Sequence, residues 1–183
     1  MVETELDILR DVSQRLESAG IAFMLTGSVA MNYYAQPRMT RDIDLVVSLD
    51  RVQADTIVNL FELDYYVDSQ AVERAIGRHS IFNLIHDRTV IKVDCIVLKS
   101  DTYRQEEFNR RRQVTLDDFH TWIVSREDLI LSKLYWAKDS KSEMQLRDVR
   151  NLLAPGCDMV YLQDRARVLG VHELLKEVLA GDE

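Results

Sequence analysis

Two aspartates stand two residues apart in the stretch TRDIDLVVS, and their spacing suits the binding of a metal ion. Apolar residues recur at every second position from Ile43 to Val47, which predicts a β-strand. Because successive side chains of a strand point to opposite faces, Asp42 and Asp44 project from the same face. Two ionised carboxylates so close repel each other unless a cation neutralises them. A hard divalent ion fits that need, and Mg²⁺ binds one or two carboxylates together with substrate phosphates.

A third carboxylate, Asp94, lies within the apolar stretch VIKVDCIVL. An aspartate flanked by apolar residues is rarely buried without a partner. A metal ion shared with Asp42 and Asp44 would supply that partner, while Lys92 and Arg88 are alternative partners close in sequence. Three carboxylates from two neighbouring strands could hold two Mg²⁺ ions, an arrangement used for in-line attack at phosphorus.

The segment Thr26-Gly27-Ser28 follows a short apolar run and precedes a helix-like segment, so we expect a strand-to-helix turn there. Glycine lets the backbone approach a ligand closely, and Ser28 offers a hydroxyl group. The free N–H groups and positive dipole end of the following helix would attract an anion such as a phosphate. A Gly-Ser pair is also an ordinary helix cap, and an Asp-x-Asp pair is often a solvated strand edge. Their occurrence together with Asp94 makes coincidence a weaker explanation.

Periodicity predicts the elements that must position these residues. Strand-like and helix-like segments alternate up to about residue 124, and the chain then reads as helices alone. We therefore expect an α/β (α+β) core over residues 1–124 and a helical region over residues 125–183 that packs on this core. The helices of the second region are expected at 126–138, 143–153, 158–169 and 171–180.

Composition narrows the class of protein. With 183 residues, 46% apolar and 30% charged, the chain suits a globular protein. Its net charge of −8 argues against a protein coated in nucleic acid or anionic membrane, but is compatible with a local basic groove. Cys95 and Cys157 match no CxxC pattern, which favours reduced thiols. The N-terminus has no signal-peptide pattern and no apolar run approaches ~18 residues, so we expect a cytoplasmic protein without membrane contact.

Several other catalytic motifs are missing from the sequence. It has no GxxxxGK[ST] or GxGxxG pattern, so neither a P-loop nor a Rossmann nucleotide site is supported. The four histidines form no zinc-binding pattern, and TGSVA differs from the GxSxG elbow of serine hydrolases.

The three acidic and glycine-serine features together resemble the nucleotidyltransferase superfamily of the DNA polymerase β type. The signature of that superfamily is a Gly-Ser or Gly-Gly turn, an Asp-x-Asp or Asp-x-Glu strand and a later strand aspartate. The stretch LTGSVAMNYYAQPRMTRDIDLVV is similar to the prokaryotic branch that contains abortive-infection toxins of type IV toxin–antitoxin pairs. In that branch an Arg-x-Thr-x-Asp-Ile-Asp motif follows the turn, and Arg38 and Thr40 are the first and third residues of this motif. Lys133 and the Arg147-Asp148 pair match the helical tail of the same branch.

The resemblance implies a mixed β-sheet flanked by helices, with a C-terminal helical bundle, and a two-metal transfer from a nucleoside triphosphate (NTP) such as ATP. Gly27 and Ser28 would hold the β- and γ-phosphates, and Lys133 would steady the triphosphate. Asp42 and Asp44 would bind both Mg²⁺ ions, and Asp94 would bind the catalytic one and help to activate the acceptor hydroxyl. Arg38 and Thr40 complete the expected nucleotide-binding residues, although Arg38 is equally compatible with a solvated turn cation.

The function expected from these residues is Mg²⁺-dependent transfer of a nucleoside monophosphate (NMP) to a hydroxyl group of RNA (tRNA), a protein or a small molecule. A non-catalytic nucleotide-binding or toxin–antitoxin module of the same fold is one alternative, and an antibiotic adenylyltransferase is another. The partners compatible with the branch are a cognate antitoxin or a second copy of the chain. Arg104 and Arg110–Arg112 form the densest basic cluster, which could guide an RNA backbone or simply face solvent.

Overall fold

A computed structural model of the chain describes residues 3–35, 37, 40, 42–140, 142–153 and 156–181. The chain divides into two compact units, which we describe separately. The first comprises Met1–Val29 and Met39–Val124, and the second comprises Ala30–Arg38 and Ser125–Glu183. The segment that follows Val29 thus groups with the C-terminal helices, and the boundaries of independently folding domains stay a prediction.

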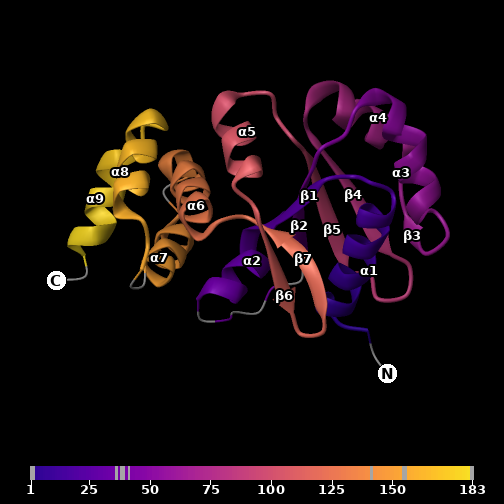
Figure 1. Ribbon diagram of the computed structural model, residues 1–183, viewed down its shortest axis with the longest axis horizontal. Helices are drawn as coiled ribbons and strands as arrows, with labels where there is room; N and C mark the ends of the chain where they lie inside the picture. Colours follow the sequence, from indigo (N-terminus) through magenta and orange to yellow (C-terminus); the bar gives the residue numbers. More distant parts are fainter. Residues whose placement is uncertain are drawn as a thin grey trace. The chain divides into compact units, whose positions relative to one another are not determined.

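One mixed sheet forms the centre of the first unit (Figure 1). Over the described residues it has seven strands in the order β3-β4-β5-β2-β1-β7-β6. The β2–β5 and β1–β7 pairs are parallel, and the other neighbours are antiparallel. The sheet therefore has the mixed character that was expected. The strands are β1 (Phe23–Thr26), β2 (Asp42–Val47), β3 (Tyr65–Tyr66), β4 (Ile81–His86), β5 (Lys92–Val97), β6 (Arg112–Leu116) and β7 (Phe119–Ile123).

Alternation along the central strands separates an apolar face of the sheet from a polar one. In β2 the side chains of Ile43, Leu45 and Val47 are buried, whereas Asp42 is exposed and Asp44 is half-buried. The strand β5 repeats this pattern, with three buried apolar side chains alternating with half-buried positions. The period-2 alternation that predicted these strands therefore also predicts which residues leave the core.

Helices of the first unit pack beside its sheet (Figure 1) and contribute buried apolar side chains to the core. Helix α4 contacts β4 and β5, and α1 contacts β7. Buried residues recur at helical spacing in α1, from Ile8 and Leu9 to Val12 and Leu16. The helical segments are α1 (Glu5–Ser18), η1 (Arg51–Gln53), α3 (Ala54–Phe61), α4 (Ser69–Arg78) and α5 (Thr102–Asn109), and α2 (Gly27–Tyr34) begins in this unit and continues in the second.

The second unit is helical over its described residues, and its four predicted helices are found within two residues of their expected bounds. The hydroxyl of Ser125 accepts a hydrogen bond from the Asp128 N–H at 3.1 Å and so caps the N-terminus of α6 (Arg126–Ser140). Helix α6 contacts α7, α8 and α9. The helices are α6 (Arg126–Ser140), α7 (Glu143–Leu152), α8 (Met159–Val168) and α9 (His172–Ala180). Among the helices that the structure describes, none combines the length and apolar character required to cross a membrane.

Candidate functional site

Four polar residues lie side by side across four adjacent strands of the polar face. Thr26 of β1 is paired with Asp44 of β2, Asp44 with Asp94 of β5, and Asp94 with Asn83 of β4. We call this set the transverse row. Because paired strands lie about 4.8 Å apart, the backbones of Asp44 and Asp94 are direct neighbours and their side chains share one face. Asp42 lies on the same face, two residues before Asp44.

Asp44 makes the closest approach to the predicted phosphate-binding turn. Gly27 follows Thr26 directly and has a φ of +65°, a conformation that glycine adopts readily. A Cβ atom at position 27 would lie 2.0 Å from Oδ2 and 2.7 Å from Cγ of Asp44. The Asp44 carboxyl group therefore packs directly against the backbone of the turn, and only a residue without a side chain fits there.

The turn itself leads straight into a helix. Helix α2 begins at Gly27, two residues earlier than the helix-like stretch from Val29 in the sequence suggests. Its first turn contains Ser28 and Val29, and the first N–H groups of any helix lack intrahelical partners. The N-terminus of this helix, with its backbone N–H groups and positive dipole end, thus lies next to Asp44.

Both carboxylate oxygens of Asp94 are engaged. The Asn83 side-chain amide donates to Oδ1, and the Lys92 ammonium lies 3.1 Å from Oδ2. The same ammonium is 3.9 Å from Oδ1 of Asp42. The hydrogen bond to Asp94 is the main cause that raises the pKa of Lys92, and the charges of Asp94, Asp42 and Asp44 add to it. All three carboxylates therefore favour the protonated, positively charged form of Lys92.

Asn83 is a residue of the candidate site that the sequence analysis missed. Its signal is present in the stretch IFNLIH, where a polar residue stands between the buried Phe82 and Leu84. Recognising its role requires the β4–β5 register, because only that pairing places Asn83 opposite Asp94.

The donor set of this face suits a metal ion that substrate helps to coordinate. Carboxylate oxygens are the ligands that Mg²⁺ prefers, and it binds through one or two of them together with phosphate oxygens. Over the residues with described placement, no three His, Cys, Asp or Glu side chains gather closely enough to enclose a metal ion. The described residues therefore form no all-protein metal cage. The assignment of two Mg²⁺ ions to Asp42, Asp44 and Asp94 stays a prediction.

Three further predicted site residues have different surroundings. The Thr40 hydroxyl donates to the main-chain oxygen of Asp42 at 3.5 Å, next to the acidic pair. Arg38 lies outside the described residues. Lys133 belongs to the second unit, where its Nζ lies 2.7 Å from Oδ2 of Asp148 and 3.3 Å from Oε1 of Gln145. Within this unit the Lys133 ammonium is thus buried in an ion pair that joins α6 to α7.

Two arginines of the basic cluster have protein partners. Arg104 pairs with the buried Glu107 at 2.7 Å, and Arg111 stacks on the rings of Phe108 and Trp122. Burial lowers the pKa of the Arg111 guanidinium. These two side chains therefore anchor α5 and the sheet edge, which weakens the interpretation of the whole cluster as an RNA guide.

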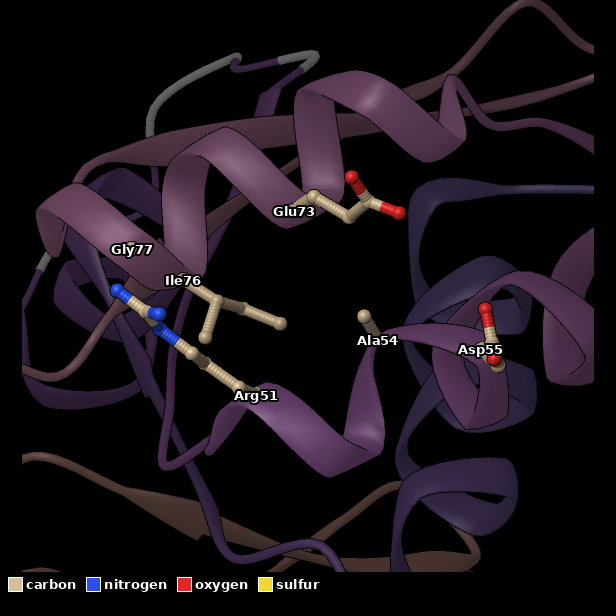
Figure 2. A pocket seen from close by; sticks show the side chains of 6 residues that line it. All are labelled: Arg51, Ala54, Asp55, Glu73, Ile76 and Gly77. Atoms are coloured by element: carbon tan, nitrogen blue, oxygen red, sulfur yellow. The ribbon is translucent and has the colours of Figure 1, made fainter.

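A separate cavity of about 360 Å³ lies among η1, α3 and α4 (Figure 2). Its lining residues, labelled in Figure 2, are Arg51, Ala54, Asp55, Glu73, Ile76 and Gly77. None of the predicted site residues lines this cavity. The cavity therefore does not contribute to the site on the polar face.

Comparisons of the sequence with known families and proteins do not assign the chain to a family. No protein-family model matches the chain, and no curated protein matches it.

Solved structures, in contrast, share the fold along most of the chain. An antigenic nucleotidyltransferase-like protein from Paracoccidioides brasiliensis is 20% identical with a TM-score of 0.61, over 96% of this chain and 92% of that one. The antibiotic-resistance factor ANT(2″)-Ia is 11% identical with a TM-score of 0.60, over 99% and 96%. A lincosamide antibiotic adenylyltransferase with bound lincomycin is 15% identical with a TM-score of 0.58, over 84% and 98%. At these identities the likeness confirms the fold, which is the nucleotidyltransferase-like mixed sheet flanked by helices that the sequence predicts.

Proposed function

We propose that the chain is a Mg²⁺-dependent nucleotidyltransferase that transfers an NMP group from an NTP to a hydroxyl acceptor. The fold alone would not support this activity, because one fold hosts many functions. The proposal rests on the side chains that this chain places on the fold.

A single observation carries the proposal: the Asp44 carboxyl group packs against Gly27, at the start of α2. An anion-binding turn and a cation-binding carboxylate are therefore in direct contact. Isolated, each feature has an ordinary structural explanation. Side by side they would suit a divalent cation and a triphosphate, the two components that metal-assisted nucleotide transfer uses.

Each residue then has a defined task. The N–H groups of the Gly27-Ser28 turn and the Ser28 hydroxyl bind the β- and γ-phosphates, with Thr40 nearby in sequence. The roles of Arg38 and Lys133 toward the triphosphate are carried over from the sequence resemblance alone. Asp42, Asp44 and Asp94 would hold the magnesium ions, which would neutralise charge on the triphosphate. The acceptor oxygen attacks the α-phosphorus and the bond to the β-phosphate oxygen breaks, so that pyrophosphate leaves. Asp94 orients the acceptor hydroxyl and receives its proton.

A small-molecule antibiotic is the acceptor that a specific observation favours. Two of the structures that share the fold over more than four fifths of this chain are an antibiotic-resistance factor and a lincosamide adenylyltransferase. The net charge of −8 is compatible with a cationic acceptor. RNA, including tRNA, and protein hydroxyls are the other acceptor classes, and a cognate antitoxin is the partner expected if the chain acts as a toxin.

The test is a transfer assay with each of the four α-labelled NTPs, Mg²⁺ and separate acceptor pools of aminoglycosides, lincosamides, total tRNA and protein. We expect label to pass to one pool with release of pyrophosphate. Asp42→Ala combined with Asp44→Ala, and separately Asp94→Asn, should lower the rate at least about a hundredfold, because each removes charge needed at the transferred phosphate. Asp55→Ala is the matched control, since Asp55 is an exposed aspartate outside the polar face.

Transfer that survives the Asp42→Ala/Asp44→Ala change would overturn the site assignment. Nucleotide binding by calorimetry without pyrophosphate release in any acceptor pool would instead favour the non-catalytic module.

A further inference from the structure

Lys92 places a positive charge in the middle of the acidic groups. Its Nζ lies 3.1 Å from Oδ2 of Asp94 and 3.9 Å from Oδ1 of Asp42. These carboxylates are two of the three to which the proposed function assigns magnesium. In the metal-free protein the ammonium thus contacts the same oxygens that a divalent ion would use.

The sheet register explains why Lys92 reaches both carboxylates. Lys92 is paired with Asp42 on β2 and precedes Asp94 by two residues on β5, so all three side chains share the polar face. This geometry is built into the backbone pairing and does not depend on a flexible loop.

The remaining oxygen of Asp94 is also committed. Asn83 donates to Oδ1 from the neighbouring strand β4, so one oxygen faces Asn83 and the other faces Lys92. A cation that binds Asp94 therefore approaches an oxygen that one of these two donors already contacts, and the positive charge of the Lys92 ammonium repels it. Replacing the ammonium is the favourable exchange, since the Lys92 side chain is 39% exposed and has room to swing into solvent.

We propose that Lys92 is a displaceable counter-cation of this site: it neutralises Asp42 and Asp94 in the metal-free protein and must leave them before a divalent ion binds. This inference rests on the proposed function for the identity of the metal ligands. It implies that metal alone binds weakly, and that binding strengthens when a triphosphate contributes further oxygens and negative charge. The displaced ammonium then remains on the face where the phosphates lie, and a lysine is a suitable point charge for them.

The charge of Lys92 determines how strongly it weakens the binding of a divalent ion. A divalent ion that binds at these carboxylates has to overcome repulsion from a positive charge a few ångströms away, or the loss of the ion pair that this charge makes. Removing the positive charge should therefore tighten metal binding by about tenfold or more.

The experiment measures Mn²⁺ binding without nucleotide, by calorimetry and by the electron paramagnetic resonance signal of free Mn²⁺. Lys92→Met should bind Mn²⁺ about tenfold more tightly than the original chain, and Lys92→Arg should bind it as weakly as the original chain. Lys99→Met is the matched control, because Lys99 is exposed just beyond the end of β5 and its removal changes net charge equally. The Lys92→Met/Asp94→Asn double variant should lose the gain.

Circular dichroism and thermal unfolding in EDTA establish that each variant is folded, and Lys92→Gln replaces Lys92→Met if the latter is not. Unchanged or weaker Mn²⁺ binding in the folded Lys92 variant, or an equal gain in Lys99→Met, would overturn the inference. If Mn²⁺ binding tightens as expected but no acceptor is ever modified, the proposed function fails while the role of Lys92 stands. If the chain transfers nucleotide but the Lys92 variant binds Mn²⁺ with unaltered affinity, the proposed function stands and the role of Lys92 fails.

Discussion

The Asp44 carboxyl group lies where a side chain on Gly27 would begin, with Oδ2 only 2.0 Å from the position of that Cβ atom. Residue 27 also has a φ of +65°. Two independent constraints, backbone conformation and close approach, therefore require glycine at this position. They also fix the distance between the Gly27-Ser28 turn and the first carboxylate of the transverse row.

The substitution Gly27→Ala should abolish nucleotidyl transfer and lower the free energy of unfolding by about 1–3 kcal/mol, since it adds left-handed strain and displaces Asp44. Two glycines separate these effects. Gly20 has a φ of +69° but no atom within 4 Å of its added Cβ, so Gly20→Ala should show the conformational cost alone, about 1 kcal/mol. Gly77 lies in helix α4 with open space around it, and Gly77→Ala should stabilise the protein by about 0.5–1 kcal/mol.

Urea unfolding gives the three stability changes, and the transfer assay gives the activities. The role of the Asp44 contact would be refuted if Gly27→Ala behaved like Gly20→Ala in stability and retained full activity.

The buried pair of Lys133 and Asp148 allows structural and functional roles to be separated. The two side chains are 5% and 2% exposed as residues, and their charges meet at 2.7 Å. Removing one partner leaves a buried charge, so Lys133→Met or Asp148→Leu should each destabilise the protein by about 3–5 kcal/mol. The double variant should recover most of that loss, because it buries no unpaired charge.

Chemical unfolding measures the coupling between the two sites, and calorimetry measures NTP binding by the stable double variant. Weaker NTP binding despite recovered stability is expected if Lys133 steadies the triphosphate. Unchanged NTP affinity would restrict Lys133 to a structural role in joining α6 and α7.

Local patterns predict much of this fold, because periodicity and capping are encoded over a few residues. The alternation around Asp42 and Asp44 predicts both the strand β2 and the face on which the carboxylates lie. The same short-range signals place the helices α6 to α9 within two residues.

The register between strands that are far apart in the sequence could not be predicted from local patterns. Nothing in the separate segments states that Asp94 is aligned with Asp44, rather than with a residue one or two positions away, and a one-residue slip would move it to the other face. The role of Asn83 depends on the same register. The choice between Lys92 and Arg88 as partner of Asp94 also depends on tertiary structure, in which Lys92 contacts Asp94 and Arg88 reaches Glu3 at 2.6 Å instead.

The turn between β4 and β5 contains a strained residue that can be improved. Val90 has a φ of +59° and is 73% exposed, and β-branched residues are poorly suited to this conformation. Val90→Asn should raise the free energy of unfolding by about 1 kcal/mol, since asparagine tolerates the left-handed region and no core contact is lost. Val52→Asn is the matched control, because Val52 is 84% exposed and lacks the positive φ.

Urea unfolding at neutral pH compares the two variants. The control should change stability by less than about 0.5 kcal/mol. Equal effects of both substitutions would show that Val90 carries no conformational strain.

The buried phenol of Tyr65 predicts how stability changes at alkaline pH. Its hydroxyl donates to Oδ2 of Asp11 at 2.6 Å, and burial, followed by this hydrogen bond, raises the pKa of Tyr65 above its ordinary value of 10.0. Above about pH 10 the unfolded chain therefore loses a proton that the folded chain retains. The contribution of Tyr65 to stability is fully present below about pH 10 and falls by about 1.4 kcal/mol per pH unit above it.

Tyr65→Phe should remove this fall and cost about 1 kcal/mol at neutral pH, because Asp11 loses a donor but is 39% exposed and keeps its ion pair with Arg15. Urea midpoints between about pH 8 and pH 11 give the difference between the two proteins at each pH. Tyr66→Phe, which removes an exposed phenol from the same strand, should follow the unsubstituted protein across the range. Parallel curves for the original chain and Tyr65→Phe would show that the Tyr65 phenol ionises equally in both states, and that its bond to Asp11 does not hold the proton.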